Sequence, residues 1–127
     1  MSRPTVAILG ASTDRTKFGN KAVRAYLRQG YDVFPVNPKG GAIEGLPVYG
    51  RLAEVPVEQL DRISVYLPPA VVLTVLDEVA AAGCRELWLN PGSESDEVLA
   101  RARQLGLEPI VACSILDLGI TPADVDR

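Results

Sequence analysis

The sequence predicts an α/β protein with a doubly wound parallel sheet in three layers, and we expect residues 1–127 to form a single domain. The first observation is a set of continuous apolar runs such as residues 5–9, typical of strands buried on both faces. The second is that these runs alternate with helical patterns along the chain, with no linker, repeat or low-complexity segment. The third is the length, since 127 residues suit one domain and are too few for two ordinary ones.

The first half of the chain contains three expected strands, one long helix and one helical turn. The strands are expected at residues 5–9, 31–36 and 46–49. The third is a short strand at the sheet edge, where proline is tolerated. A helix is expected at residues 18–29 because its apolar residues fall on one stripe, and Gly30 suits the C′ position that ends it. A single helical turn is expected at residues 52–55.

The second half repeats the alternation. Strands are expected at residues 62–67, 86–90 and 108–112, and helices at residues 70–82 and 95–105. Gly83 and Gly106 follow the two helices as stop signals. The tail beyond Ser114 is apolar enough to pack on the body, but its form is not predicted. Because parallel crossovers are right-handed, we expect the Rossmann-like strand order 3-2-1-4-5-6.

Charge and hydropathy exclude two classes of partner. The chain carries 13 basic and 16 acidic residues, a net charge of −3, and their scatter provides no basic face for nucleic acid. No apolar stretch approaches the roughly 20 residues that span a bilayer, and Met1–Pro4 is not an apolar leader. We therefore expect a cytoplasmic protein with a small-molecule nucleotide ligand, and neither a nucleic acid nor a membrane as partner. A homodimer or a protein partner stays open.

The residue types that usually perform catalysis are scarce. The chain has no histidine, which excludes Ser-His-Asp and Cys-His mechanisms and a phosphohistidine intermediate. Cys84 and Cys113 form no CxxC pair, so we expect two reduced, buried thiols rather than zinc ligands. The carboxylates form no pair or cluster typical of a metal site. We expect a binding protein with no catalytic residue and no metal.

The turn after the first strand is the most informative candidate site. Ligands of such sheets lie at the carboxyl ends of the strands, where the winding reverses. There Gly10 permits a sharp turn and a close approach of ligand to the backbone, and Ala11 continues that turn. Ser12 and Thr13 add hydroxyl donors, and Lys17 adds a positive charge. The turn and the following helix N-terminus predict a phosphate site, with an ordinary strand-to-helix turn as the alternative.

The surrounding residues restrict the phosphate ligand. The turn is not GxGxxG, because the next glycine, Gly19, is too distant to serve as the second or third glycine of that fingerprint. An NAD site favours an acid at the end of the second strand, where this chain has Asn37, Pro38 and Lys39. A lysine there suits a phosphate on the adenosine ribose, as in coenzyme A (CoA) or NADP. The alternative is that Lys39 is a solvated loop residue.

Two further turns lie at the same expected edge. Leu67, Pro68 and Pro69 either form a flat apolar wall for adenine or place proline at the start of a helix for structural reasons.

The other turn is formed by Asn90, Pro91 and Gly92. It either closes the pocket over a pantetheine arm or pyrophosphate, or simply leads into the next helix, with Ser93 or Ser95 as N-cap.

Taken in order, these segments resemble a known family. The chain is similar to small stand-alone CoA-binding domain proteins and to the N-terminal domain of the succinyl-CoA synthetase alpha subunit. The matching segments are residues 6–12, 30–39, 45–49 and 86–92, with Pro68-Pro69 and Gly106. The resemblance implies a Rossmann-like fold with CoA across the strand ends. Residues 10–13 would hold phosphate, 37–39 would flank the nucleotide phosphates, 67–69 would meet adenine and 90–92 would lie near the pantetheine.

Our leading hypothesis is a non-catalytic protein that binds CoA or acyl-CoA, as a sensor or a carrier. The resemblance implies no ligase activity, because the synthetase's catalytic histidine lies in a second domain. One alternative is an NADP-dependent oxidoreductase or a fragment of one. Another is a partner-binding subunit with a vestigial nucleotide pocket.

Overall fold

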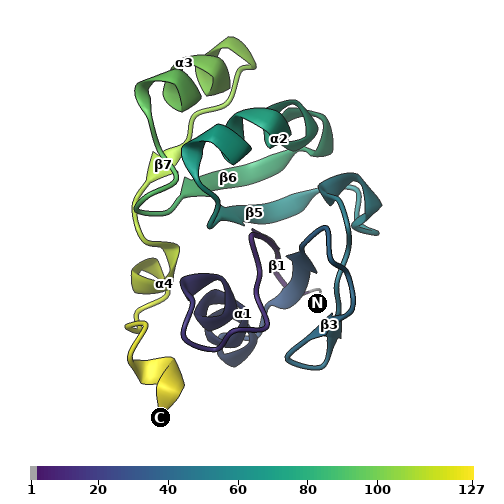
Figure 1. The fold of residues 1–127 in the computed structure, drawn as a ribbon, viewed down its shortest axis with the longest axis vertical. Coiled ribbons are helices and arrows are strands. Elements are labelled where there is room, and N and C mark those ends of the chain that lie inside the picture. The colour runs from purple at the N-terminus through teal and green to yellow at the C-terminus, as the bar shows by residue number, and fades with distance from the viewer. Residues whose placement is uncertain (1–2) are drawn as a thin grey trace.

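A computed structural model describes residues 3–127 (Figure 1). Met1 and Ser2 belong to the N-terminal segment that we expect not to be an apolar leader, and they lie outside the described residues. The main sheet has five parallel strands in the order β2-β1-β5-β6-β7. These strands are β1 (Thr5–Leu9), β2 (Asp32–Val36), β5 (Leu60–Val65), β6 (Cys84–Leu89) and β7 (Ile110–Val111). The helices are α1 (Phe18–Arg28), α2 (Pro69–Ala82), α3 (Asp96–Gln104) and α4 (Ser114–Asp117), with 3-10 turns at Leu52–Glu54 and Asp124–Asp126.

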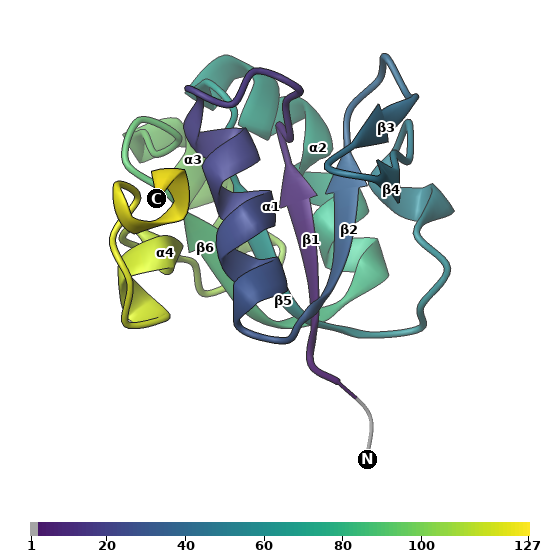
Figure 2. The same ribbon diagram turned by 90° about the horizontal axis from the view of Figure 1, so that it is seen from below.

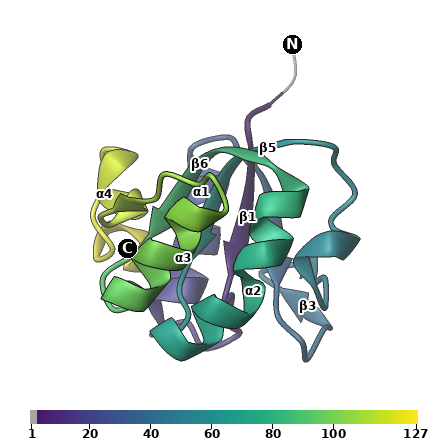
Figure 3. The same cartoon turned by 90° about the horizontal axis from the view of Figure 1, so that it is seen from above.

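Helices cover both faces of the sheet, so the three-layer, doubly wound prediction is confirmed. Figure 2 shows α1 and α4 on one face, and Figure 3 shows α2 and α3 on the other. Side chains of β1 alternate between these layers. Val6 and Ile8 pack in a cluster with α1, whereas Ala7 and Leu9 pack in a cluster with α2 and α3. All four are buried, as expected for a central parallel strand.

The expected third strand at residues 46–49 is wrong, and so is the first position of the order 3-2-1-4-5-6. Residues of this segment form a separate antiparallel hairpin of β3 (Ala42–Ile43) and β4 (Leu46–Pro47). Pro47 has no N–H with which to extend a ladder, so the segment forms no continuous strand along β2. Only Tyr49 makes a parallel bridge to Val36, with Tyr49 N–H donating to Pro35 O and Asn37 N–H donating to Tyr49 O, both at 2.9 Å.

The remaining elements lie close to their expected positions. The strand predicted at residues 62–67 spans Leu60–Val65, and the last strand shortens to Ile110–Val111. The tail packs on the body as expected, because Ile115 and Val125 are buried in the cluster with α1. Its form is a short helix followed by a 3-10 turn.

The structure shows the state of the two cysteines and tests whether any helix could span a membrane. Both Cys84 and Cys113 are free and half-buried rather than fully buried. Burial raises the pKa of the Cys84 thiol to about 11, so this thiol is protonated at neutral pH. None of the helices in residues 3–127 combines the length and the apolar character needed to cross a bilayer.

Candidate functional site

The turns predicted as sites all follow parallel strands and therefore meet at one edge of the sheet. Two cavities open at this edge, one on each face. The larger, about 470 Å³, lies between the ends of β1 and β2 and the α2 helix. The smaller, about 220 Å³, lies on the α1 face and is lined by residues including Phe18, Tyr66 and Cys113. The consecutive residues Tyr66 and Leu67 line the smaller and the larger cavity respectively.

The predicted residues divide between these cavities. Gly10, Asn37, Pro38 and Leu67 line the larger one. Asn90 and Pro91 line the smaller one.

Eight predicted residues line neither cavity: Ala11, Ser12, Thr13, Lys17, Lys39, Pro68, Pro69 and Gly92. Four of them belong to the loop between β1 and α1.

Two glycines set the path of that loop. Gly10 has a φ of +84°, and a Cβ there would overlap the Tyr66 carbonyl oxygen. A Cβ on Gly19 would overlap the carbonyl oxygen of Gly10. Gly19 therefore permits the close helix–strand packing that the third glycine provides in dinucleotide-binding folds. The inference that Gly19 is too distant for such a role is wrong, because the chain between the two glycines folds back.

Free donors line the loop. The N–H of Gly10 donates to Val36 O at 3.3 Å and is therefore engaged. By contrast, no group in the described part of the chain accepts a hydrogen bond from the amides of Ala11, Ser12 or Thr13. Lys17 is the N-cap of α1, whose first turn carries no acidic residue. Unpaired amides beside an acid-free helix N-terminus suit an anionic oxygen.

The Ser12 hydroxyl and the Asp14 carboxylate form hydrogen bonds with other residues of the same loop. Ser12 Oγ accepts a hydrogen bond from Asp14 N–H at 3.0 Å. The Asp14 carboxylate accepts hydrogen bonds from the Thr16 hydroxyl at 2.6 Å and from the Thr16 amide at 3.0 Å. These bonds lower the pKa of Asp14, so it remains a carboxylate at neutral pH. Asp14 therefore acts as a turn-forming residue.

Side-chain amides hold the loop carbonyls. Asn37 Nδ2 donates to Ala11 O at 2.8 Å, and the buried Asn20 Nδ2 donates to Ser12 O at 2.9 Å. Asn37 thus ties the loops after β1 and β2 together.

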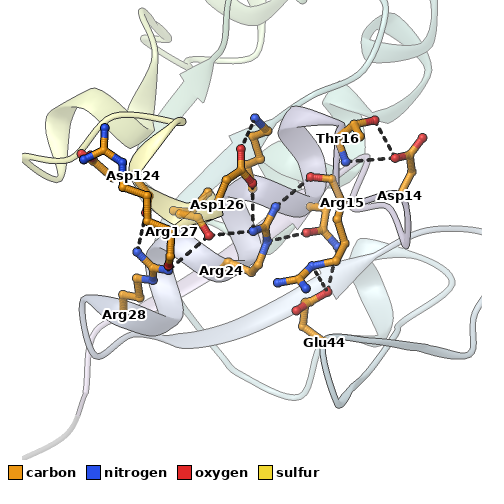
Figure 4. Close-up of polar contacts among 12 residues, drawn as sticks. Asp14, Arg15, Thr16, Arg24, Arg28, Glu44, Asp124, Asp126 and Arg127 are labelled. Atoms are coloured by element: carbon orange, nitrogen blue, oxygen red, sulfur yellow. Dashed lines mark hydrogen bonds and ion pairs between the residues drawn. The ribbon is translucent and has the colours of Figure 1, made fainter.

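Arg24 extends this network to the C-terminal segment (Figure 4). Its guanidinium is largely buried and donates to Arg15 O at 2.7 Å, to Asn20 Oδ1 at 2.8 Å and to Val125 O at 2.7 Å. It also pairs with Asp126 at 3.1 Å. One buried arginine therefore connects the loop between β1 and α1, the helix and the C-terminal tail.

The turn after β6 is also internally bonded. The buried Asn90 donates to Ser64 Oγ and Val65 O, and accepts from Ser114 N–H, each at 2.9 Å. The Ser114 hydroxyl lies 2.7 Å from Ser64 Oγ and 3.3 Å from the Tyr66 hydroxyl. Burial raises the pKa of Tyr66, which stays a neutral phenol facing the smaller cavity.

The structure shows the helix-starting role proposed for the prolines, and the adenine contact stays a prediction. Pro68 is the N-cap residue of α2 and Pro69 is at its first helical position, so both start the helix. Leu67 alone of this turn contacts the larger cavity. At the next helix, Ser95 is the N-cap and accepts from Val98 N–H at 3.1 Å.

Several cavity residues escaped the sequence analysis. On α2, a row at helical spacing faces the larger cavity, and it comprises Val71, Thr74, Val75 and Glu78. The spacing was visible in the sequence, but which face met the cavity was not. Arg51 lines the same cavity and gave no local signal. Phe18 and Tyr66 were missed in the smaller cavity.

Comparisons with known proteins identify the family and support the fold. The model of the CoA binding domain family matches residues 4–118. Among solved structures, a conserved hypothetical protein from Pyrococcus furiosus has 34% identity and a TM-score of 0.79, and the match covers 91% of this chain and 99% of that one.

The curated relatives are much longer proteins. A trans-feruloyl-CoA synthase of an unknown prokaryotic organism is 32% identical over 63% of this chain and 12% of its own length. An ADP-forming acetate–CoA ligase of Archaeoglobus fulgidus is 26% identical over 81% of this chain and 16% of its own length. The chain thus spans less than a fifth of either relative. With a family match over most of its residues and the expected fold, this chain belongs to the CoA-binding domain family.

Proposed function

We propose that this chain binds CoA or acyl-CoA across the carboxyl edge of its sheet and performs no chemistry on it. The observation that carries the proposal is the row of unpaired amides at Ala11, Ser12 and Thr13, in the loop that packs beside the first turn of α1. A row of amides at a helix N-terminus is a favourable position for a pyrophosphate. Family membership selects CoA among the ligands that carry one.

The two cavities suit the two ends of such a ligand. The larger cavity has apolar walls that include Leu52, Val71 and Val75, which suit an adenine ring. The smaller cavity lies on the other face beside Asn90, Tyr66 and Cys113, and would receive the pantetheine end. The loop between β1 and α1 connects the two cavities, because Gly10 at its start lines the larger cavity and Phe18 at its end lines the smaller.

The chemistry of the site favours binding over catalysis. The sequence has no histidine, and the loop carboxylate of Asp14 is committed to Thr16. The polar groups beside the smaller cavity, Asn90 and Tyr66, are neutral and hydrogen-bonded within the protein. A sensor or a carrier of acyl groups fits such a site. A ligase or synthase activity like that named for the curated relatives would need the much longer chains in which they occur.

Calorimetry tests the proposal on the full chain. Titration with CoA and acetyl-CoA is expected to give saturable heat, and no heat at millimolar ligand would exclude the function. A larger thermal shift with NADPH than with CoA would favour the oxidoreductase alternative, because a ligand stabilises the state it binds. A vestigial pocket predicts no shift with any nucleotide.

A charge variant tests the loop itself. Thr13 is exposed, so Thr13→Glu should leave the fold intact while repelling the pyrophosphate. We expect CoA affinity to fall by about tenfold, and Thr13→Gln, which is matched in shape, to keep most of it. Equal affinity of the two variants would remove the loop from the binding site.

A further inference from the structure

The larger cavity contains one cationic side chain within the described residues. This is Arg51, whose side chain is 70% exposed at the rim. The acidic residues of the same lining are Asp77 and Glu78, and both are paired, Asp77 with Arg101 at 2.8 Å and Glu78 with Arg51 at 2.7 Å. Arg51 is therefore the side chain of this rim that can attract an anionic group.

The failed third strand is what brings Arg51 to the site. Tyr49 bridges to Val36 at the end of β2, and its carbonyl accepts from Asn37 N–H at 2.9 Å. Two residues later the chain reaches Arg51, beside the carboxyl end of β2. In Rossmann-type sheets the adenosine ribose lies at this end of the second strand, and an arginine nearby accommodates the 2′-phosphate of NADP. The 3′-phosphate of CoA is on the neighbouring carbon of the same ribose.

Glu78 aligns the guanidinium. Arg51 donates from Nε at 3.0 Å and from Nη2 at 2.7 Å to the same oxygen, Glu78 Oε2. Its Nη1 has no acceptor among the described residues. A guanidinium has five N–H donors, so three remain free while the side chain is held in place. Such a group pairs strongly with a phosphate.

Lys39, the residue that the sequence analysis favoured for this role, occupies a different position. Its side chain is exposed and lines neither cavity, and its backbone N–H donates to Asn37 Oδ1 at 2.9 Å. Arg51 lines the larger cavity from the adjacent loop, and Lys39 does not line it.

We propose that Arg51 is the specificity-determining residue for the 3′-phosphate on the adenosine ribose of CoA, with Glu78 positioning its guanidinium. The inference rests on the proposed function, since it assigns one end of that ligand to the larger cavity. Arg51, at the rim of that cavity, would then discriminate CoA from dephospho-CoA.

The experiment is calorimetry with CoA and dephospho-CoA on the wild type, Arg51→Met and Lys39→Ala. Arg51→Met is expected to weaken CoA binding by about ten- to thirtyfold, as for the loss of a charge-assisted pair, and dephospho-CoA binding by less than twofold. Adenosine 3′,5′-bisphosphate against AMP repeats the comparison without the pantetheine arm. Arg103→Met, an exposed arginine of α3 far along the chain from the site, is the matched control.

The outcomes separate the two claims. Failure of the wild type to bind CoA overturns the proposed function. Binding by the wild type with an equal loss of both ligands in Arg51→Met overturns the role of Arg51, as does a CoA-selective loss that is larger in Lys39→Ala. A wild-type preference for NADP⁺ over NAD⁺ that exceeds its preference for CoA over dephospho-CoA overturns the 3′-phosphate assignment. Glu78→Gln is expected to reduce the CoA preference by a smaller factor, because it loosens Arg51 without removing it.

Discussion

Gly10 and Gly19 show how single residues without side chains shape the candidate site. Gly10 is required twice, by its positive φ and by the Tyr66 carbonyl that a Cβ would overlap. Gly19 has ordinary helical backbone, so only its contact with Gly10 O requires glycine. The path of the loop that holds the unpaired amides depends on both contacts.

Gly19→Ala is expected to destabilise the protein. Helix propensity alone favours alanine by about 1 kcal/mol. Overlap with a backbone oxygen, which cannot rotate away, should reverse that sign and give a net loss of about 2 kcal/mol. The measurement is urea unfolding, together with CoA calorimetry.

Gly50→Ala is the control for the unfolding measurement alone, because Gly50 lines the larger cavity. The nearest atom to its added Cβ is the flexible Glu54 Oε1 at 3.3 Å. Its free energy of unfolding should change by less than about 0.5 kcal/mol. A Gly19→Ala protein as stable as the wild type would contradict the assigned packing role.

Cys84 makes stability depend on alkaline pH. Burial raises its pKa in the folded state from 9.0 to about 11, so folding favours the protonated thiol. This contribution is fully present below pH 9 and is lost as pH rises through 11. The free energy of unfolding should therefore fall between pH 9 and 10, before the buried tyrosines contribute.

Cys84→Ala should flatten that fall, as measured by urea unfolding at several pH values. The same slope in wild type and Cys84→Ala would rule out the thiol as the source.

At the scale of elements, α1 packs against the sheet with one face and forms hydrogen bonds to the loop and the tail with another. Ala22, Val23 and Tyr26 pack toward the sheet. Asn20 and Arg24, four residues apart, lie on another face and bind the loop and the tail. One helix therefore joins the loop between β1 and α1 to the C-terminal segment.

Arg24→Met is expected to lower the free energy of unfolding by about 3 kcal/mol. The substitution leaves the carbonyl of Arg15 and the Asn20 amide oxygen without their donor, and leaves Val125 O with Arg28 as its remaining donor. The tail should then become sensitive to limited proteolysis. The measurements are urea unfolding and mass spectrometry of the digest.

Arg103→Met, on the exposed surface of α3, is the control and should change stability by less than about 0.5 kcal/mol. An Arg24→Met protein with wild-type stability and a protected tail would show that the network does not hold these elements.

At the scale of the molecule, the sheet divides the core into two clusters. The central strands β1 and β5 have pairing strands on both sides, whereas the β3–β4 hairpin stands outside the main sheet (Figure 1). Both cavities open where the central strands end. The rigid centre therefore carries the edge on which the ligand is proposed to lie.

Hydrogen exchange should follow this organisation. Amides of β1 and β5 are expected to exchange only by global unfolding, because they pair within a buried sheet. Amides of residues 42–47 should exchange orders of magnitude faster, by local opening of a short hairpin. Mass spectrometry of exchanged peptides measures both, and equal protection of the two regions would contradict the prediction.

Local signals carried much of the prediction. Apolar runs and helical spacing located the main strands and helices, and the glycine at position 10 located the loop after β1. The error at residues 46–49 arose because the apolar pattern resembles a strand of the main sheet. Pro47 has no N–H to donate to β2, and it pairs with Ala42 in a separate hairpin. The fold class could therefore be predicted from short-range patterns, but the sheet edge could not.

By itself the sequence determined the parallel α/β class, the place of the glycine turn after the first strand and the lack of histidine. Backbone conformation and periodicity depend on neighbouring residues, and composition needs no structure at all. Only the tertiary structure decided that Gly19 packs on Gly10, that Arg24 joins the loop to the tail and that Arg51 reaches the larger cavity. Each of these depends on a meeting of segments distant in the chain. Such meetings are set by how the whole core packs, which no local pattern records.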